Sequence, residues 1–274
     1  MFAVILLLIN LATIFFGIYL FDYLPDGSVN TVWIILLSII SGTVVMVLVF
    51  ALYVDIFYVL VAKRKPKNSM LKHFIAKQIM TIPLVATNTR IEVIGKENLP
   101  NDPGFSIYSN HTSMMDIPVL MYKLKEYPVA FLAKEVVGKL ISVGKWTPEL
   151  GCVMIDRENT RKGAEAIINV IKNVKNGSTV VIFPEGTRSK EFGKLLDFKH
   201  GSFKVALKSK APLVPVSIVK PANFKSIKWP FPKRIKLIIH QPIPYEEVKQ
   251  MTSVELSQKV RSIIEEPITI TMQK

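Results

Sequence analysis

One histidine and one aspartate in this sequence have a spacing that suits general base catalysis. His111 and Asp116 lie five positions apart, directly after the apolar run Phe105–Tyr108. On one continuous helix, five residues would turn the two side chains about 140° apart, so they meet only if His111 precedes the helix. Thr112 or Ser113 is a good N-cap for a helix that begins after the histidine. An aspartate on one imidazole nitrogen would fix the tautomer, and the other nitrogen could then take a proton.

The same residues also fit a purely structural interpretation. Ser113 and Asp116 have the spacing of a capping box, in which a carboxylate satisfies amide groups at the start of a helix. The spacing by itself leaves both interpretations open.

A second polar segment follows an apolar run further along the chain. Val180–Phe183 has the composition of a buried strand, and it continues into Pro-Glu-Gly-Thr-Arg-Ser, which ends at Ser189. Open α/β sheets bind their ligands at the carboxyl ends of strands, and a glycine such as Gly186 lets backbone amides approach a substrate oxygen. An ordinary turn with an incidental glutamate–arginine pair is the alternative.

Four segments, taken in order, resemble the glycerolipid acyltransferases of the 1-acylglycerol-3-phosphate (lysophosphatidate) acyltransferase type. The resemblance covers about residues 85–220. The similar segments are His111-x4-Asp116, Gly151–Arg157, Phe183–Ser189 and Leu213–Val216. They are similar to the family's catalytic block, its phosphate-binding arginine block, its third block and its largely structural fourth block, respectively.

This resemblance implies a role for each matching residue. His111 would be the catalytic base and Asp116 the residue that orients it. The implied substrate-binding residues are Lys134, Arg157, Glu185, Gly186, Thr187 and Arg188. Among these, the three cations would bind the acceptor phosphate, and amides around Gly186 could hold the developing oxyanion. No metal site is expected, because one cysteine and four scattered histidines do not make one.

The implied reaction transfers a fatty acyl group from a thioester to the sn-2 hydroxyl of lysophosphatidate. Its product is phosphatidate, so the reaction belongs to phospholipid biosynthesis. The expected partners are a lysophospholipid acceptor, acyl-CoA or acyl-carrier protein as the donor, and membrane lipids, with no nucleic acid and no cofactor beyond the donor. The alternatives are another acceptor, such as glycerol-3-phosphate or another lysolipid, and, more distantly, a membrane-tethered basic binding module.

Short apolar runs alternate with helical patterns through the segment that carries these residues. This alternation predicts an α/β sandwich with a largely parallel sheet. Strands are expected near 90–95, 104–109, 128–132, 152–156, 178–183, 213–219 and 234–240. Helices are expected near 113–124, 134–142, 161–175, 198–209 and 251–266.

The N-terminal part of the chain is apolar and lacks basic residues. Residues 1–62 contain no Lys or Arg, so all 35 basic residues lie further on, in a chain of net charge +14 and mean hydropathy +0.34. The runs 2–21 and 32–54 are each long enough for a helix across a hydrocarbon core about 30 Å thick. Pro25 and Gly27 lie between them, which predicts a hairpin. The expected organisation is therefore a membrane helical hairpin over 1–62, a basic juxtamembrane stretch with an amphipathic helix over 63–84, and an acyltransferase domain over 85–274.

Four basic residues within 63–67 follow the second apolar run. Positive charge next to a membrane span favours the cytoplasmic side, so the domain after it is expected on the cytoplasmic face of the membrane. A cleaved signal peptide is one alternative. Asp55 and the apolar residues after it leave open whether the hairpin spans the bilayer or lies in one leaflet.

The amphipathic helix is expected to end near Pro83. Its apolar stripe comprises Leu71, Phe74, Ile75, Gln78, Ile79 and Ile82. Lys72, His73 and Lys77 lie outside this stripe, so the pattern predicts an amphipathic helix that either packs on the body or lies on lipid.

The apolar N-terminal runs predict how the protein can be extracted. We expect it to stay with the membrane fraction in high salt and in alkaline carbonate, and to be released by detergent, because each run buries about 20 apolar residues. Fractionation followed by immunoblotting measures this. Full release by carbonate would contradict the predicted membrane helices.

Overall fold

The computed structural model describes residues 2–22, 31–139, 144–156, 159–189, 191, 193–224, 226–228 and 230–272. Within it the chain divides into two compact units, Met1–Arg64 and Lys65–Lys274. The first unit is helical, and the second contains the sheet and every residue of the expected site.

Two long apolar helices form the first unit. They are α1 (Phe2–Asp22) and α2 (Thr31–Phe57), and a π-helical turn, Tyr58–Ala62, continues α2. The stretches Ala3–Leu20 and Val32–Ala62 are long and apolar enough to cross a membrane. The expected hairpin turn at 23–30 lies outside the described residues.

Small residues let α1 and α2 approach each other closely. A Cβ added to Gly17 would lie 2.6 Å from the hydroxyl oxygen of Ser38, and one added to Gly42 would lie 3.1 Å from the carbonyl oxygen of Asn10. Close backbone approach at small residues is how apolar helices associate where no hydrophobic effect separates them from lipid.

The second unit is built on a seven-stranded sheet in the order β1-β7-β6-β2-β5-β3-β4. All neighbouring pairs are parallel except β6 with β7, so the expected α/β sandwich with a largely parallel sheet is confirmed. The strands are β1 (Thr89–Ile94), β2 (Ser106–Ser109), β3 (Val129–Lys134), β4 (Val153–Ile155), β5 (Thr179–Ile182), β6 (Leu213–Val219) and β7 (Lys233–Ile239).

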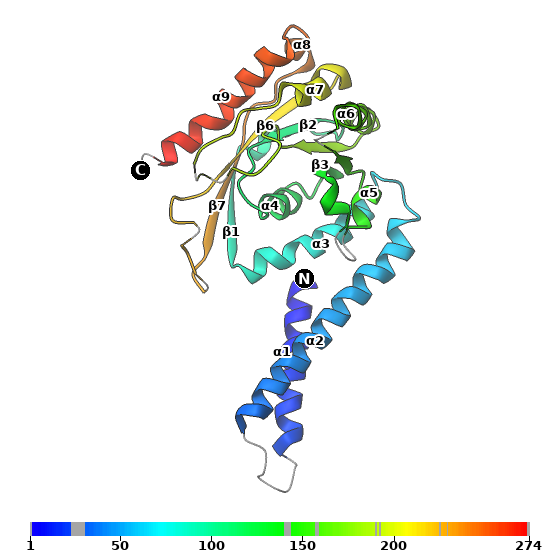
Figure 1. Ribbon diagram of the computed structural model, residues 1–274, viewed down its shortest axis with the longest axis vertical. Helices are drawn as coiled ribbons and strands as arrows, with labels where there is room; N and C mark the ends of the chain where they lie inside the picture. The colour runs from blue at the N-terminus through cyan, green and yellow to red at the C-terminus, as the bar shows by residue number, and fades with distance from the viewer. Residues whose placement is uncertain are drawn as a thin grey trace. The chain divides into compact units, whose positions relative to one another are not determined.

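Helices cover both faces of this sheet (Figure 1). On one face lie α6 (Thr160–Lys175), α7 (Lys204–Ser209) and α9 (Ser253–Met272), with the short α8 (Tyr245–Val248) beside α7; on the other lie α3 (Met70–Ala86), α4 (Asp116–Lys123) and the short α5 (Trp146–Glu149). Every residue of the central strands β2, β5 and β6 is buried. Burial on both faces explains why these strands are continuous apolar runs in the sequence.

Two expected helices differ from the structure. The helix expected at 134–142 is a 3₁₀ turn, Glu135–Lys139, and 140–143 lie outside the described residues. The helix expected at 198–209 begins as a separate 3₁₀ turn, His200–Phe203, before α7. Such short turns connect elements where the chain changes direction, and an apolar period does not distinguish them from a full helix.

The buried face of helix α3 combines part of the expected apolar stripe, Ile75 and Ile79, with the three cationic residues outside it. Lys72 and His73 are fully buried and Lys77 is almost fully buried, whereas Leu71 and Phe74 are about half exposed. The apolar stripe therefore did not indicate that these three residues are buried. The helix also continues three residues past Pro83, the expected stop.

Backbone carbonyls explain how α3 can bury cationic side chains. Lys72 donates a 2.9 Å hydrogen bond to the Glu149 carbonyl, and Lys77 donates to the carbonyls of Lys125 and Tyr127. Burial lowers the pKa of His73 to about 4 and that of Lys77 to about 8. These carbonyls belong to segments more than 45 residues away in sequence, so the pattern within 70–86 contains no sign of them.

Candidate active site

The expected site residues gather at one edge of the sheet. Strands β2, β5 and β3 are parallel neighbours, so their carboxyl ends lie along the same edge. His111 follows β2, Glu185 follows β5, and Lys134 is the last residue of β3. This is the edge at which open α/β sheets place their ligands.

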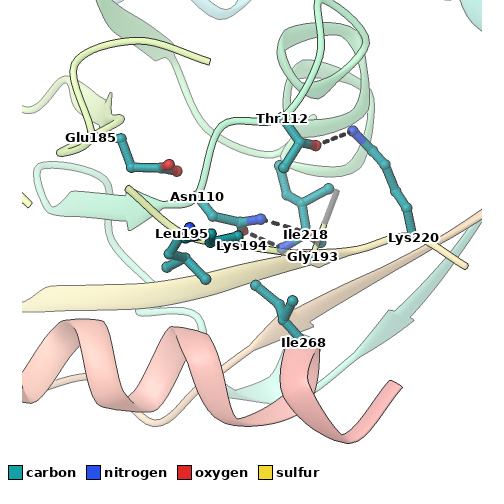
Figure 2. A pocket seen from close by; sticks show the side chains of 9 residues that line it. All are labelled: Asn110, Thr112, Glu185, Gly193, Lys194, Leu195, Ile218, Lys220 and Ile268. Atoms are coloured by element: carbon teal, nitrogen blue, oxygen red, sulfur yellow. Dashed lines mark hydrogen bonds between the residues drawn. The ribbon is translucent and has the colours of Figure 1, made fainter. Parts of the chain in front are cut away.

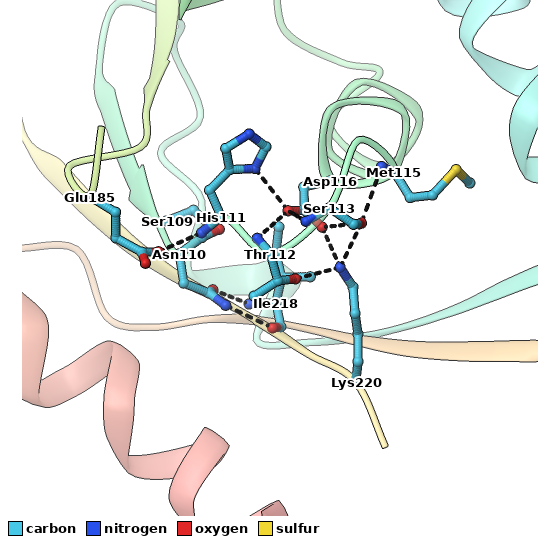
Figure 3. Close-up of polar contacts among 10 residues, drawn as sticks. All are labelled: Ser109, Asn110, His111, Thr112, Ser113, Met115, Asp116, Glu185, Ile218 and Lys220. Carbon is cyan, nitrogen blue, oxygen red and sulfur yellow. Dashed lines mark hydrogen bonds and ion pairs between the residues drawn. The ribbon is translucent and has the colours of Figure 1, made fainter. Parts of the chain in front are cut away.

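His111 and Asp116 are in direct contact. The imidazole Nδ1 lies 2.9 Å from Asp116 Oδ2, and the side chains are 16% and 0% exposed. Asp116 is the first residue of α4, so His111 lies in the turn before the helix, which is the arrangement that lets residues five apart meet. The Phe183 ring stacks on the imidazole with the ring centres 4.2 Å apart. Figure 3 shows the second imidazole nitrogen pointing away from Asp116.

The Asp116 carboxylate also caps α4. Its Oδ2 accepts hydrogen bonds from the amides of Thr112 (2.7 Å) and Ser113 (2.8 Å). The Ser113 hydroxyl accepts in turn from the Met115 amide at 3.2 Å. Capping and orientation of the imidazole are therefore performed by the same group, and the two interpretations of the sequence do not exclude each other.

A buried lysine completes this cluster (Figure 3). Lys220 Nζ lies 2.5 Å from Asp116 Oδ1, and it donates to the hydroxyls of Thr112 (2.6 Å) and Ser113 (2.8 Å). Burial by itself would raise the pKa of Asp116, but the His111 hydrogen bond and the Lys220 charge hold it below its usual value. The carboxylate is therefore ionised at neutral pH.

Asn110 fastens the histidine turn to the neighbouring strand. Its side-chain amide donates to the Ile218 carbonyl (3.0 Å) and its side-chain oxygen accepts from the Ile218 amide (2.7 Å). The side chain thus replaces one more backbone pair between β2 and β6, just where β2 has ended.

Glu185 holds the histidine turn from the other side. One carboxylate oxygen accepts from the His111 amide (2.7 Å) and the other from the Leu196 amide (2.9 Å). The Ser189 amide donates to the His111 carbonyl at 3.0 Å, so the loop after β5 binds both backbone groups of His111. Glu185 is 3% exposed, and burial raises its pKa to about 7 although the two amides oppose this.

The turn at Gly186 requires glycine. Its φ is +76°, and an added Cβ would lie 2.9 Å from Cε of Lys199. The Gly186 amide donates to the Phe183 carbonyl at 3.0 Å, so this amide is engaged within the turn rather than free for a substrate oxygen. Thr187 and Arg188 are exposed on the outside of the turn.

Comparisons with known proteins agree with this geometry. Residues 90–219 match the Acyltransferase family model. A 1-acyl-sn-glycerol-3-phosphate acyltransferase of Bacillus subtilis is 34% identical over 166 residues, which cover 60% of this chain and 79% of that protein. The chain belongs to the 1-acyl-sn-glycerol-3-phosphate acyltransferase family. A relative of that name from Borreliella burgdorferi is 29% identical, over 72% of this chain and 78% of its own.

The fold agrees with a solved acyltransferase structure as well. The crystal structure of the 1-acyl-sn-glycerophosphate (LPA) acyltransferase PlsC from Thermotoga maritima matches with a TM-score of 0.61 and 27% identity, covering 81% of this chain and 94% of that one. The chain spans only half the length of the Arabidopsis thaliana chloroplast relative LPAT1, with 32% identity. The family match over residues 90–219 lies within the unit that contains the sheet and the site.

Lys134 and Arg157 are two of the residues expected to bind the acceptor phosphate. Lys134 is exposed at the carboxyl end of β3. Arg157 lies outside the described residues, two positions after the last residue of β4, which pairs with β3 in parallel. Strand order directs the carboxyl end of β4 toward the edge where His111 lies.

A small cavity lies behind the histidine turn, on the side of α9 (Figure 2). Its volume is about 20 Å³, and Asn110, Glu185, Ile218 and Lys220 are among the residues that line it. A cavity of this size has room for about one water molecule. It is far too small for a lipid, so we place the reacting groups on the opposite side of the turn, where the second imidazole nitrogen points.

Lys220 is the member of this buried cluster that the sequence motifs did not indicate. It comes directly after the seven-residue strand β6, every residue of which is buried. A single cation at the end of such a strand, four residues after the fourth similar segment, was the available signal. It was weak, because Lys220 is 104 residues from the aspartate that it contacts.

The raised pKa of Glu185 predicts how stability depends on pH. The folded state keeps the proton up to about pH 7 and the unfolded state loses it near 4.5, so this group lowers the free energy of unfolding as pH rises between these values. We expect a decrease of about 1–3 kcal/mol that Glu185→Gln removes. Chemical unfolding in detergent at a series of pH values measures it.

Glu191→Gln is the matched control for this experiment. Glu191 lies in the same loop, is 71% exposed and pairs with Lys194, so its loss should leave the slope unchanged. An identical slope in Glu185→Gln and the wild type would show that Glu185 is not the group responsible.

Proposed function

We propose that this protein transfers a fatty acyl group from an acyl thioester to the sn-2 hydroxyl of lysophosphatidate, forming phosphatidate. The observation that carries this proposal is the contact of His111 Nδ1 with the buried, ionised carboxylate of Asp116. Family membership and the names of the relatives support the choice of substrates.

The contact determines which imidazole nitrogen can react. Asp116 Oδ2 also accepts two backbone amides, so it acts as an acceptor and His111 Nδ1 carries the hydrogen. His111 Nε2 then has the free electron pair and takes the proton of the sn-2 hydroxyl as that oxygen attacks the thioester carbonyl. When the tetrahedral intermediate collapses, the leaving thiolate receives this proton from Nε2, and the imidazole returns to its starting state.

The acceptor is its own nucleophile in this reaction. No acyl-enzyme and no resident cofactor or metal ion is needed, because the thioester supplies the activated acyl group. Acyl-CoA and acyl-carrier protein both provide such a thioester, and either could be the donor.

Lys134, Arg157 and Arg188 are proposed to bind the acceptor phosphate, for which the two-pronged guanidinium is better suited than an ammonium. Thr187 and the backbone at Gly186 are proposed to line the substrate site, with Glu185 supporting the turn.

The apolar N-terminal helices associate the protein with a membrane, where its lipid acceptor is dissolved. We propose that the sheet domain lies on the cytoplasmic face, because the basic residues of 63–67 directly follow the second helix. Another acceptor, such as glycerol-3-phosphate or a different lysolipid, would use the same base and differ in the groups around the phosphate. A membrane-tethered basic binding module would not need the His111–Asp116 contact at all.

Substitution of the base tests the proposed reaction. His111→Ala should reduce acyl transfer to lysophosphatidate at least 1000-fold, about the upper part of what general base catalysis contributes, and should leave the fold intact because the side chain lies in a turn. Labelled acyl donors with a panel of lysolipids, and thermal melting of both proteins, measure the two effects. Activity within a few-fold of the wild type would support a purely capping role for the turn.

Substitution of the second-block arginine tests the proposed acceptor. Arg157→Ala should lower kcat/KM for lysophosphatidate by about 10–100-fold, the effect of one lost charge-assisted contact, and should change donor binding little. A monoacylglycerol, which lacks the phosphate, should be affected much less. Arg161→Ala, at a position where the side chain is 90% exposed, is the control. An equal decrease in kcat/KM for both acceptors would contradict the proposal that Arg157 binds the phosphate.

A further inference from the structure

The turn before α4 does not need the positive charge of Lys220 to stabilise the Asp116 carboxylate. The amides of Thr112 and Ser113 already donate to Asp116, and the imidazole adds a third hydrogen bond. A carboxylate that accepts several amide hydrogen bonds is stable as an anion without a cation beside it. Burying an ammonium group is costly, and Lys220 is 3% exposed while Asp116 is 0% exposed. The lysine therefore needs an explanation other than capping.

The contacts of Lys220 all act on the turn that carries the base. Its ammonium group bonds Asp116 Oδ1 and the hydroxyls of Thr112 and Ser113, which leaves Oδ2 directed at the imidazole. The Phe224 ring lies 5.4 Å from Nζ and covers it. The lysine is thereby held in one place, on the side of the carboxylate opposite the histidine.

We propose that Lys220 is a positioning residue that neutralises Asp116, so that Asp116 orients His111 without its charge favouring a protonated imidazole. This inference depends on the proposed role of His111 as the base. An aspartate without a counter-charge favours a protonated imidazole beside it, and a protonated imidazole cannot accept the hydroxyl proton. An aspartate paired with a lysine still orients the imidazole by a hydrogen bond, while its net charge no longer holds the proton on the ring.

Other charged groups near the turn act more weakly on the imidazole. Glu185 bonds the backbone amide of His111, and its raised pKa keeps part of the population uncharged near pH 7. Arg261 of α9 acts electrostatically on Glu185. Arg188, in the loop after β5, is exposed to solvent and therefore screened.

Three substitutions separate the charge of Lys220 from its hydrogen bonds. Lys220→Met removes both, Lys220→Gln keeps donors without the charge, and Lys220→Arg keeps the charge. Lys236→Met is the control, because Lys236 pairs with Val219 in the sheet, next to Lys220 in the chain, but its side chain is exposed.

The pH dependence of activity is the main measurement. In Lys220→Met and Lys220→Gln, the acidic limb of the kcat/KM profile should move to higher pH by about one unit, the size of the effect of one nearby charge. At pH 7, kcat should fall by up to about 10-fold in Lys220→Met, the largest loss that a one-unit shift can cause, and less in Lys220→Gln, with KM little changed. Lys220→Arg and Lys236→Met should keep the limb of the wild type.

A second measurement does not depend on activity. Diethyl pyrocarbonate modifies imidazole only in its unprotonated form. Mass spectrometry of the peptide that contains His111 gives the pH at which this residue is half-modified. We expect this pH to rise by the same amount in the variants that lack the charge. If Lys220→Met does not fold, both measurements are made on Lys220→Gln, which also lacks the charge. An unchanged limb and an unchanged midpoint in the uncharged variants would overturn the proposal.

The proposed function and the proposed role of Lys220 fail in different ways. If His111→Ala is inactive while the uncharged Lys220 variants keep the wild-type profile and midpoint, the role of Lys220 alone is wrong. If His111→Ala remains active, the catalytic assignment is wrong, and the diethyl pyrocarbonate midpoint still reports whether Lys220 controls the protonation of the imidazole.

Discussion

The carboxylate of Asp116 is the group on which the arrangement of this site depends. It lies fully buried at the first residue of α4, and it contacts the imidazole of His111, the amides of the turn and the ammonium of Lys220 at once. A buried anion is tolerated only when such partners surround it. These partners therefore surround the carboxylate in one cluster. The carboxylate is fixed by their hydrogen bonds, and it in turn orients the imidazole of His111.

The parallel sheet brings the parts of this cluster together. The turn after β2 carries the histidine, β6 beside it ends at Lys220, and β5 on the other side leads into the loop with Glu185. Both backbone groups of His111 are bonded by that loop, and Asn110 bonds the backbone of Ile218 in β6. A disturbance in any of the three strands would thus reach the imidazole through short hydrogen bonds rather than through flexible side chains.

Glu185 and Lys220 are the two buried charged residues that we propose support His111 without contacting the substrate. Each is almost completely buried and bonds the histidine turn, one through the backbone and the other through the orienting carboxylate. The two side chains lie on different sides of that turn, and both line the small cavity behind it. Perturbed carboxyl and ammonium groups gather at functional sites for this reason, since desolvation there makes each charge effective over a short distance.

The sequence by itself determined the strand–helix alternation, all seven strands, the His111–Asp116 pair and the family, because apolar periodicity and short motifs are local properties of the chain. It did not indicate that the cationic residues of α3 are buried, and it missed Lys220. Both involve buried cations whose partners are distant in sequence: the carbonyls of Tyr127 and Glu149 for α3, and Asp116 for Lys220. From the sequence alone a lysine is expected at the surface, because a buried ammonium group needs hydrogen-bond acceptors around it. Only the tertiary structure determines where those acceptors lie.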